Sequence, residues 1–326
     1  MEKRALGRVG IEVSPVGFGC WAIGGPFTRA GNDEPLGWGE VDDDESVRAI
    51  RRAVELGVTF FDTADVYGAG HSERVLGKAL AGMRDQVVIA TKWGNTFDEA
   101  TKVMHHQDTS AEYVHKAVRA SLERLGTDYI DLYQLHCDAT NDVALPLREA
   151  CEDLVREGLI RSYAWSTDTL SSAEFFAEGE HCSAVQHEAS VLHDAPEFFA
   201  LCERVDLASI NRTPLGMGLL GRRDANRPAT GADIRTLPPS WLQYFDKGGV
   251  PAPEWADKVS AIRDVLESDG RTLAQGALAW LWARSPRTVP IPGFRTVAQA
   301  EENARAMEFG PLRDDQLAEI ATLLGR

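Results

Sequence analysis

The chain has 326 residues, 44% of them hydrophobic, which is enough for a sizeable core and excludes an intrinsically disordered protein. Acidic side chains outnumber Lys and Arg by 50 to 34, and the formal net charge of -16 disfavours nucleic acid and membrane surfaces as partners. The five cysteines are dispersed without a C-x-x-C pair, and no apolar run could span a bilayer, so we expect a reduced, cytoplasmic protein.

The first forty residues predict a small hairpin, a buried strand and a loop. Residues 4–13 combine short β-prone runs with glycines, which is typical of two paired strands. The apolar run 16–20 predicts the first strand of a sheet, and the Gly- and Pro-rich segment 24–39 predicts a loop. Acidic residues at 42–44 favour the start of a long helix, because negative charge stabilises a helix N-terminus.

From there to the end of the chain, helix-like and strand-like stretches alternate. Repeated strand–helix units predict a parallel sheet, and eight of them predict an α/β fold, a closed (β/α)8 TIM barrel. Without a Pro- or Ser-rich linker, we expect one domain over residues 1–326, with the hairpin as an N-terminal cap and long loops on the C-terminal face. The later strands are expected at 58–62, 87–92, 129–136, 160–165, 183–187, 206–211 and 287–291. The helices are expected at 43–56, 72–81, 110–125, 146–157, 170–177, 196–204, 254–267, 272–284, 296–307 and 314–324.

The longest irregular stretch, residues 221–253, follows the seventh strand. A loop of this length in a compact domain is usually functional or disordered. It carries Trp241, Tyr244 and Phe245 among prolines and glycines, and two interpretations stay open. These aromatic side chains form either a lid on the substrate side or a layer packed against the barrel rim.

Ionisable residues stand where three neighbouring strands are expected to end. By the two-residue period of a strand, Asp62, Lys92 and His136 each share a face with apolar residues before them, and Tyr67 follows on a loop. Singly, each has an ordinary explanation: a turn carboxylate, a lysine reaching solvent, a core histidine, a packing tyrosine. Together, at the carboxyl ends of parallel strands, they favour a catalytic site.

These four types of side chain suit one chemical step. A phenol with a pKa of about 10 is a weak acid at neutral pH, and an adjacent ammonium favours its phenolate. A buried carboxylate can hold that ammonium in place, and an imidazole can orient a carbonyl oxygen by hydrogen bonding. The set can therefore protonate an oxygen on which negative charge develops.

The motifs that contain these residues, F-D-T-A-D-V-Y-G, A-T-K-W-G and L-Y-Q-L-H, resemble those of the aldo-keto reductases. The similarity runs from the first hairpin to the last barrel helix. It implies that Asp62, Tyr67, Lys92 and His136 form the catalytic tetrad of that family. It also implies a reversible reduction of an aldehyde or ketone, in which the 4-pro-R hydride of a nicotinamide goes to the carbonyl carbon and Tyr67 gives the proton.

The resemblance extends to segments that hold a nicotinamide dinucleotide. Ser166 and Gln186 match the residues that bind the carboxamide, while Thr167 replaces the usual Asn and lacks its two amide donors. The segment R-T-P-L-G-M-G-L-L-G resembles the S-P-L-x-x-G-x-L segment that wraps the pyrophosphate. Arg212 stands where many members stack a Tyr on the nicotinamide. The contacts implied for this segment are Arg212, Pro214, Leu215, Gly216, Gly218 and Leu220.

A second segment, I-P-G-F-R and the helix after it, resembles the adenosine-binding signature of the family. Arg295 is the candidate partner for a 2′-phosphate, which predicts NADPH, with NADH as the alternative. An ion pair of Arg295 with Glu301 or Glu302 is the competing interpretation. No G-x-G-x-x-G fingerprint follows a strand, as expected for a cofactor bound on a barrel. The contacts implied here are Gly293, Phe294, Arg295, Gln299, Glu302 and Asn303.

We expect a small-molecule carbonyl or alcohol substrate in an aromatic-walled pocket, with Trp21, Trp93 and Phe97 as candidates for its walls. An aromatic aldehyde and the apolar face of a sugar both suit such a pocket. Spacings such as H-x-H or H-E-x-x-H are absent, so no metal is expected and a metal-dependent hydrolase or isomerase is disfavoured. The leading alternative function is an NADP(H)-binding subunit that senses redox state or binds a partner with little turnover.

Overall fold

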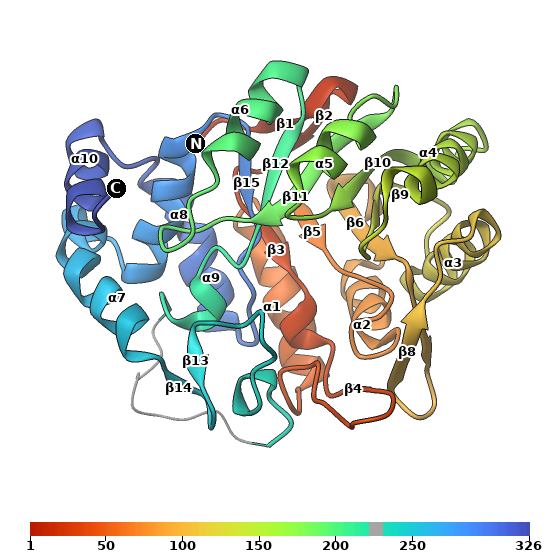
Figure 1. Cartoon of the computed structure of the whole chain (residues 1–326), viewed down its shortest axis with the longest axis horizontal. Coiled ribbons are helices and arrows are strands. Elements are labelled where there is room, and N and C mark those ends of the chain that lie inside the picture. Colours follow the sequence, from red (N-terminus) through yellow and green to blue (C-terminus); the bar gives the residue numbers. More distant parts are fainter. Residues whose placement is uncertain (222–230) are drawn as a thin grey trace.

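The computed structural model describes residues 1–221 and 231–326, in which helices surround a barrel of parallel strands (Figure 1). The sheet has the strand order β15-β12-β11-β10-β9-β6-β5-β3, and its neighbouring strands pair in parallel. The TIM-barrel prediction is therefore confirmed. The barrel strands are β3 (Gly17–Gly19), β5 (Phe60–Asp62), β6 (Val88–Trp93), β9 (Ile130–Leu135), β10 (Ile160–Ser166), β11 (Cys182–Glu188), β12 (Ala208–Arg212) and β15 (Thr288–Pro290).

The first and last segments of the barrel meet at a seam. Gly19 forms a parallel bridge with Gly293, and its backbone N–H donates to the carbonyl oxygen of Pro292 at 3.0 Å. A Cβ at residue 19 would lie 2.8 Å from the carbonyl oxygen of Ile291, which is closer than ordinary contact. A glycine at this position lets the two segments approach and close the sheet.

The helices confirm the expected alternation. Several begin at side-chain caps; Asp42, for example, accepts from the backbone N–H of Glu45 at 3.0 Å. One start was wrong: α4 begins at Asn141 and not at 146, because the backbone N–H of Ala144 already donates to Thr140 at 2.9 Å, ahead of Pro146. The helices are α1 (Asp43–Glu55), α2 (His71–Leu80), α3 (Ala111–Leu125), α4 (Asn141–Arg156), α5 (Leu170–Phe176), α6 (Pro196–Val205), α7 (Pro253–Leu266), α8 (Leu273–Arg284), α9 (Val297–Arg305) and α10 (Asp314–Leu323).

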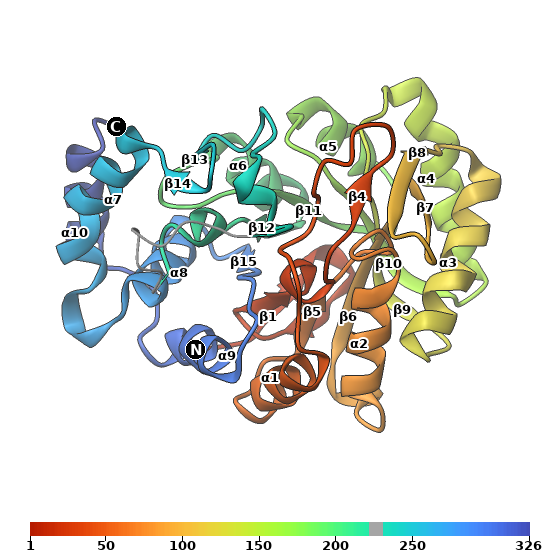
Figure 2. The same ribbon diagram turned by 90° about the horizontal axis from the view of Figure 1, so that it is seen from below.

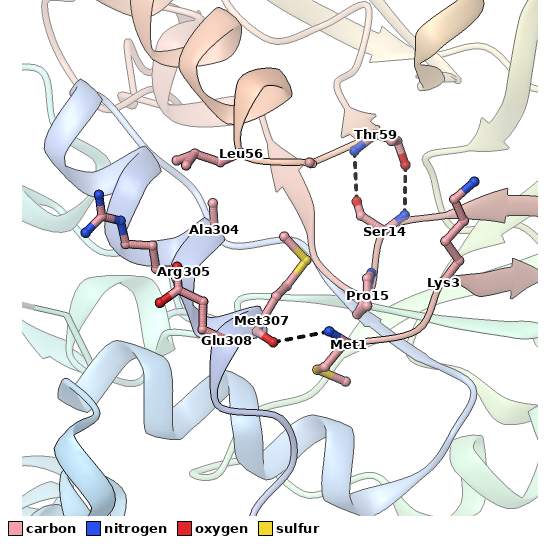
Figure 3. Close-up of a pocket in the computed structure, with 11 residues that line it drawn as sticks. Met1, Lys3, Ser14, Pro15, Leu56, Thr59, Ala304, Arg305, Met307 and Glu308 are labelled. Atoms are coloured by element: carbon pink, nitrogen blue, oxygen red, sulfur yellow. Dashed lines mark hydrogen bonds between the residues drawn. The ribbon is translucent and has the colours of Figure 1, made fainter.

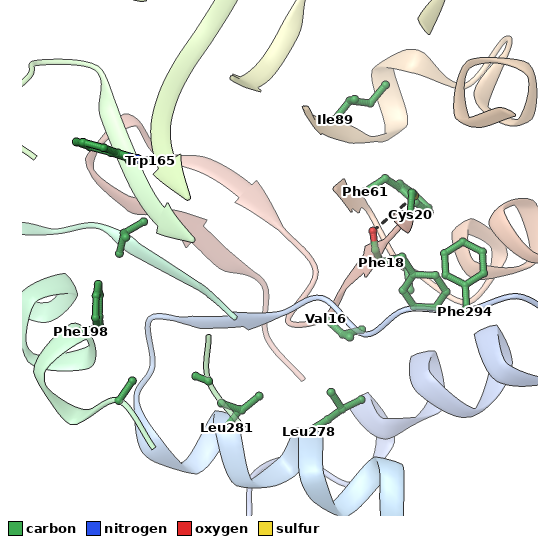
Figure 4. Close-up of a cluster of buried hydrophobic side chains, with 14 of the residues drawn as sticks. Val16, Phe18, Cys20, Phe61, Ile89, Trp165, Phe198, Leu278, Leu281 and Phe294 are labelled. Carbon is green, nitrogen blue, oxygen red and sulfur yellow. Dashed lines mark hydrogen bonds between the residues drawn. The ribbon is translucent and has the colours of Figure 1, made fainter. Parts of the chain in front are cut away.

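Two apolar layers fill the structure. Side chains inside the barrel pack on Leu6 and Val13 of the N-terminal hairpin, whose strands β1 (Arg4–Leu6) and β2 (Ile11–Val13) pair antiparallel as predicted. The larger layer lies between the barrel and the helices (Figure 4). Strand alternation separates the two: Phe60 belongs to the inner layer and Phe61 to the outer one.

Additional strands lie in the predicted loop 24–39, in the stretch 221–253, and in the connection between the strand expected at 87–92 and the helix expected at 110–125. Strands β4 (Thr28–Arg29), β7 (Asn95–Asp98) and β8 (Val103–Gln107) form a small sheet in the order β4-β8-β7, and they lie together in Figure 2. Strands β13 (Phe245–Asp246) and β14 (Val250–Pro251) pair within the stretch 221–253. Residues 222–230 of that predicted loop lie outside the described residues. The two-residue strands are too short to leave a period in the sequence, which is why they were missed.

One hollow of about 350 Å³ lies where the N-terminal segment meets the end of α9 (Figure 3). It is lined in part by Ser14 and Thr59, which hydrogen-bond each other just before β3 and β5 begin. It therefore opens at the N-terminal ends of the strands, away from Asp62 and Lys92 at their carboxyl ends.

Candidate active site

The turn after β5 sets the position of Tyr67. Backbone N–H groups of Thr63 and Asp65 donate to the carbonyl oxygens of Ala90 and Lys92 on β6, at 2.8 and 3.2 Å. Gly68 adopts a φ of 61°, and a Cβ there would collide with the carbonyl oxygen of Gly24. The chain can make this close approach because residue 68 is glycine, and Tyr67 is thereby held above the strand ends.

Lys92 is the centre of the candidate site. Its side chain is 0% exposed, and its ammonium pairs with Asp62 Oδ1 and donates to the carbonyl oxygen of Thr63 at 2.7 Å. Its third contact is Tyr67 Oη at 3.4 Å. His136, which follows β9, meets the ring of Tyr67 edge-on with the centroids 5.7 Å apart. The structure thus brings all four predicted side chains together at one end of the barrel.

Burial and charge act in opposite directions on these groups. Burial raises the pKa of the Tyr67 phenol above its usual 10, and the Lys92 ammonium offsets only part of that effect. Burial works to lower the pKa of Lys92, but Asp62 and Tyr67 outweigh it and leave that pKa above its usual value. Tyr67 therefore stays protonated and Lys92 charged at neutral pH.

His136 is held as a neutral imidazole. Burial first, and the charges of Lys92 and Arg212 second, lower its pKa well below the usual range. Its Nδ1 is buried and has no hydrogen-bond partner among residues 1–221 and 231–326. A neutral imidazole keeps one N–H, which can be donated to an oxygen at the mouth of the barrel.

These protonation states predict how carbonyl reduction depends on pH. An acid must carry its proton to donate it, so the rate is lost only as the pH rises through the raised pKa of Tyr67. We expect kcat for reduction to stay flat from about pH 6 to about pH 10 and to fall only above that. The check is a kcat profile at saturating cofactor; a decline centred between about pH 6 and 8 would contradict the assignment.

Aromatic side chains line the mouth beside Tyr67. The ring of Trp21 stacks on Tyr67, with centroids 5.9 Å apart and planes inclined by 25°. Two further rings, Trp38 and Trp241, lie 5.6 and 6.5 Å from Trp21, and Trp241 is 51% exposed. Phe97 packs in the same small apolar cluster as Trp21 and Tyr67. Trp38 and Trp241 were not among the residues predicted for the pocket walls.

Trp93 does not lie at this mouth. It is fully buried in the outer apolar layer, with its ring 5.9 Å from that of Tyr133. The reason is strand alternation: because Lys92 faces the barrel interior, the next residue of β6 faces the helices. Trp93 is therefore not retained as a candidate for the substrate pocket.

The aromatic side chains of the stretch 221–253 lie in two different places. Tyr244 and Phe245 are buried, and the hydroxyl of Tyr244 donates to Glu188 at 2.7 Å. Trp241 instead reaches the mouth beside Trp21. Packing on the rim and contact with the substrate side are thus both present, on different residues.

The predicted carboxamide-binding residues adjoin the tetrad. Ser166 and Gln186 stand opposite each other in the β10–β11 register, and the side chain of Gln186 donates to Asp62 Oδ2 at 2.8 Å. Thr167 is buried, and its hydroxyl accepts from the backbone N–H of Thr169 at 3.1 Å. Gln134 also donates to Asp62 Oδ2, at 2.8 Å, and was missed as a site residue. The two-residue period that placed Lys92 and His136 also put Gln134 on the inner face.

Arg212 pairs with two carboxylates at the rim. Its guanidinium contacts Asp168 and lies 3.7 Å from Glu188, which stands opposite it in the β11–β12 register. Neither carboxylate was predicted at the site. The charge of Arg212 is therefore partly neutralised. Arg212 stands at the position where the resemblance implies a tyrosine ring stacked on the nicotinamide in many members.

The segment after β12 turns tightly. Its backbone N–H groups close short turns, such as Gly216 to Thr213 at 2.9 Å and Gly218 to Leu215 at 3.0 Å. The side chains of Pro214 and Leu220 are buried. A Cβ at Gly218 would lie 3.2 Å from the guanidinium of Arg235. The backbone of Gly218 and the cation of Arg235 therefore border the same space. Arg235 itself pairs with Asp233.

The predicted adenosine segment is held together by its own side chains. Asn303 donates to the carbonyl oxygen of Gly293 at 3.3 Å, and Gln299 accepts from the backbone N–H of Arg295 at 2.8 Å. Phe294 is buried with its ring 4.9 Å from Phe18 (Figure 4). Glu302 lies on α9, and its carbonyl oxygen accepts from Gln275 at 3.0 Å.

Arg295 and the start of α9 have partners within the chain. The guanidinium of Arg295 donates to the carbonyl oxygens of Trp38, at 3.0 Å, and Glu40. Glu301, one of the acidic residues expected to pair with it, binds Arg52 instead. The backbone N–H of Val297 donates to the carboxylate of Glu45 at 2.8 Å, and this bond, with Arg48, lowers the pKa of Glu45.

Two features are absent from the described part of the chain. No group of three or more His, Cys, Asp or Glu side chains is arranged to hold a metal ion. No helix within 1–221 or 231–326 is both long and apolar enough to cross a membrane.

Comparison with known proteins agrees with this geometry. The chain is 28% identical over 318 residues to the uncharacterized oxidoreductase YqkF of Bacillus subtilis, covering 97% of this chain and 94% of that protein. An aldo-keto reductase of Bacillus halodurans in its holo form superposes with a TM-score of 0.78 at 30% identity, covering 99% and 96% of the two chains. An aldo-keto reductase of Klebsiella pneumoniae in complex with NADPH does so with a TM-score of 0.70 at 25% identity, covering 99% and 96%. Since the model of the aldo/keto reductase family matches residues 15–324, nearly the whole barrel, the chain belongs to the aldo/keto reductase family.

Proposed function

We propose that the protein reduces an aldehyde or ketone to the alcohol with NADPH. The observation that carries the proposal is the fully buried Lys92, which contacts Asp62 on one side and Tyr67 Oη, at 3.4 Å, on the other. When bound, the cofactor supplies the hydride to the carbonyl carbon. The protein's own side chains then have to deliver one proton to the carbonyl oxygen and stabilise the charge that develops there.

The four side chains divide this work. Tyr67 donates its phenol proton to the carbonyl oxygen, and Lys92 stabilises the phenolate that remains. Asp62 holds the ammonium of Lys92 in position. The neutral imidazole of His136 donates a hydrogen bond to the same carbonyl oxygen and fixes its orientation.

The residues present fit a nicotinamide dinucleotide. The amide oxygen of Gln186 has no partner within the described ranges, and it lies beside Ser166. The hydroxyl of Thr213 is buried and, within those ranges, also lacks a partner at the start of the tight turn after β12. These groups would hold the carboxamide and the pyrophosphate, and the bare backbone at Gly218 would let the latter come close. The complex of the Klebsiella relative with NADPH supports the choice of cofactor.

Cofactor preference is expected to depend on Arg295. Replacing Arg295 by Ala should weaken NADPH binding by about 10- to 100-fold and NADH binding by no more than about twofold, because a charge-assisted bond to the 2′-phosphate is lost. Cofactor titrations of protein fluorescence provide the measurement. Arg52→Ala, which removes a cation paired with Glu301 on α9, is the matched control. If the substitution weakens NADPH and NADH binding equally, the role of Arg295 is to hold the loop at Trp38 and Glu40 in place and not to bind the 2′-phosphate.

The aromatic mouth supports a substrate with a flat, apolar face next to its carbonyl. Either an aromatic aldehyde or the apolar face of a sugar can lie on Trp21 and Trp241. Removing the exposed ring by Trp241→Ala should raise KM for such a substrate by about three- to tenfold with kcat little changed, because a stacked ring is worth about 0.5–1.5 kcal/mol. Leu237→Ala, an exposed residue of the same stretch, is the control. An unchanged KM would remove Trp241 from the substrate site.

The direct test is loss of the reduced-nicotinamide absorbance when the purified protein is mixed with NADPH and a panel of aldehydes. Multiple turnovers support the proposal. Tight NADPH binding without turnover on any of them would favour a redox-sensing subunit instead. Absence of NADPH binding would contradict both functions.

A further inference from the structure

Charged side chains of β11 and β12 lie one layer above the tetrad, toward the mouth of the barrel. Gln186 on β11 donates to Asp62 Oδ2 at 2.8 Å, so this residue marks the depth of the tetrad. Glu188 is two residues further along β11, so it shares the face of Gln186 and lies about 7 Å closer to the mouth. Arg212 on β12 stands opposite Glu188 in the register, and its guanidinium lies 3.7 Å from that carboxylate.

Asp168, which follows β10, completes this group. Its carboxylate contacts the guanidinium of Arg212 and also accepts from the backbone N–H of Glu188 at 2.8 Å. Glu188 in turn accepts from the hydroxyl of Tyr244 at 2.7 Å. The guanidinium is therefore held in position by carboxylates at the ends of two neighbouring strands. We call Arg212, Asp168 and Glu188 the rim charges.

The charge of Arg212 acts on the tetrad. Burial is the main cause of the low pKa of His136, and the cations of Lys92 and Arg212 lower it further. Burial raises the pKa of Tyr67, and the same two cations oppose that rise. Since Tyr67 and His136 bind the carbonyl oxygen in the proposed reaction, the hydride donor has to lie beside them. The rim charges therefore act on the part of the cofactor that changes charge on oxidation.

We propose that Arg212 weakens the binding of the oxidised cofactor relative to the reduced one, so that the site is loaded with NADPH when both forms are present. This inference rests on the proposed function. Loss of the hydride leaves a positive charge on the nicotinamide ring, whereas the ring of NADPH is neutral and the rest of the molecule is unchanged. A cation next to the tetrad repels the oxidised ring, and the carboxylates of Asp168 and Glu188 moderate that repulsion.

The ratio of the dissociation constants of NADP+ and NADPH measures this effect, because contacts common to the two forms cancel. Arg212→Met removes one positive charge and should lower the ratio by about three- to tenfold, as expected for a unit charge about 7–10 Å away at a partly screened site. Glu188→Gln removes one negative charge, keeps an acceptor for Tyr244, and should raise the ratio by a similar factor. Both constants are measured by quenching of protein fluorescence, without turnover.

The opposite signs of the two shifts separate an effect of charge from structural damage, which would weaken the binding of both forms alike. In the double variant Arg212→Met/Glu188→Gln the net charge of the wild type is restored, so the ratio should return close to the wild-type value. The matched control is Arg263→Met, which removes a cation paired with Glu267 at 3.0 Å on α7, at the outside of the structure (Figure 1). It should leave the ratio unchanged.

Each result bears on a definite claim. A wild-type ratio in Arg212→Met, with both forms still bound, would overturn the proposal, and so would shifts of the same sign in Arg212→Met and Glu188→Gln. Should Arg212→Met fail to fold, Arg212→Gln, which can still hydrogen-bond to Asp168, decides the question in the same way. If the wild-type protein binds neither NADP+ nor NADPH, it is the proposed function that fails.

Discussion

Tyr67→Phe is expected to lower kcat for carbonyl reduction by about 10²- to 10⁴-fold, because it removes the acid while leaving the shape of the mouth intact. Stacking on Trp21 and the edge contact with His136 involve the ring and not the hydroxyl, so NADPH binding and folding should change little. The measurement combines single-turnover rates with a cofactor titration.

Tyr113→Phe is the control for that substitution. Its hydroxyl donates to the carbonyl oxygen of Asn95 at 2.9 Å and lies outside the tetrad, so a loss of about threefold at most is expected. Should Tyr67→Phe keep its rate within about tenfold of the wild type, another group must supply the proton, and His136 would be the first to examine.

Lys92→Met is expected to damage stability as well as activity. Asp62 is 2% exposed and Lys92 0%, and removal of one partner from a buried pair leaves an uncompensated charge that costs about 3–5 kcal/mol. In the double variant Asp62→Asn/Lys92→Met that charge is gone, so most of the free energy of unfolding should return while activity stays lost. Denaturant unfolding of the wild-type protein, Lys92→Met and the double variant provides the comparison.

An exposed ion pair offers the matched control for this substitution. Lys78 lies 3.4 Å from Asp44, with 63% and 78% of the two side chains exposed. Lys78→Met should change the free energy of unfolding by no more than about 0.5 kcal/mol. If Lys92→Met proves no more costly than Lys78→Met, the ammonium of Lys92 is not the structural centre of the site.

The barrel and the tetrad could be predicted because each rests on a local pattern. Buried strands and amphipathic helices alternate along the chain, and the two-residue period assigns Asp62, Lys92 and His136 to one face. The same period places Trp93 on the opposite face, so its prediction as a wall of the pocket gave more weight to residue type than to strand geometry. Gln134 satisfied the period and was overlooked because an amide does not titrate.

Other features depend on contacts that no local pattern records. Trp38 bridges to Asp233, and Arg295 donates to the backbone at Trp38 and Glu40, across segments far apart in the sequence. The ion pairs of Arg212 with Asp168 and Glu188 join the ends of three different strands. Such partners follow from the register and curvature of the closed sheet, which the sequence does not display.

The hairpin packed into the barrel has a consequence for turnover. Leu6 and Val13 belong to the apolar layer inside the barrel and Lys92 is 0% exposed, so in the described part of the chain buried side chains separate the phenol of Tyr67 from the hairpin end of the barrel. If Tyr67 is the acid, as proposed, its phenolate has to take up a proton after each reduction, on the side from which the alcohol departs. In the proposed mechanism, product departure and reloading of the acid thus both take place at the mouth where Trp21 and Trp241 lie.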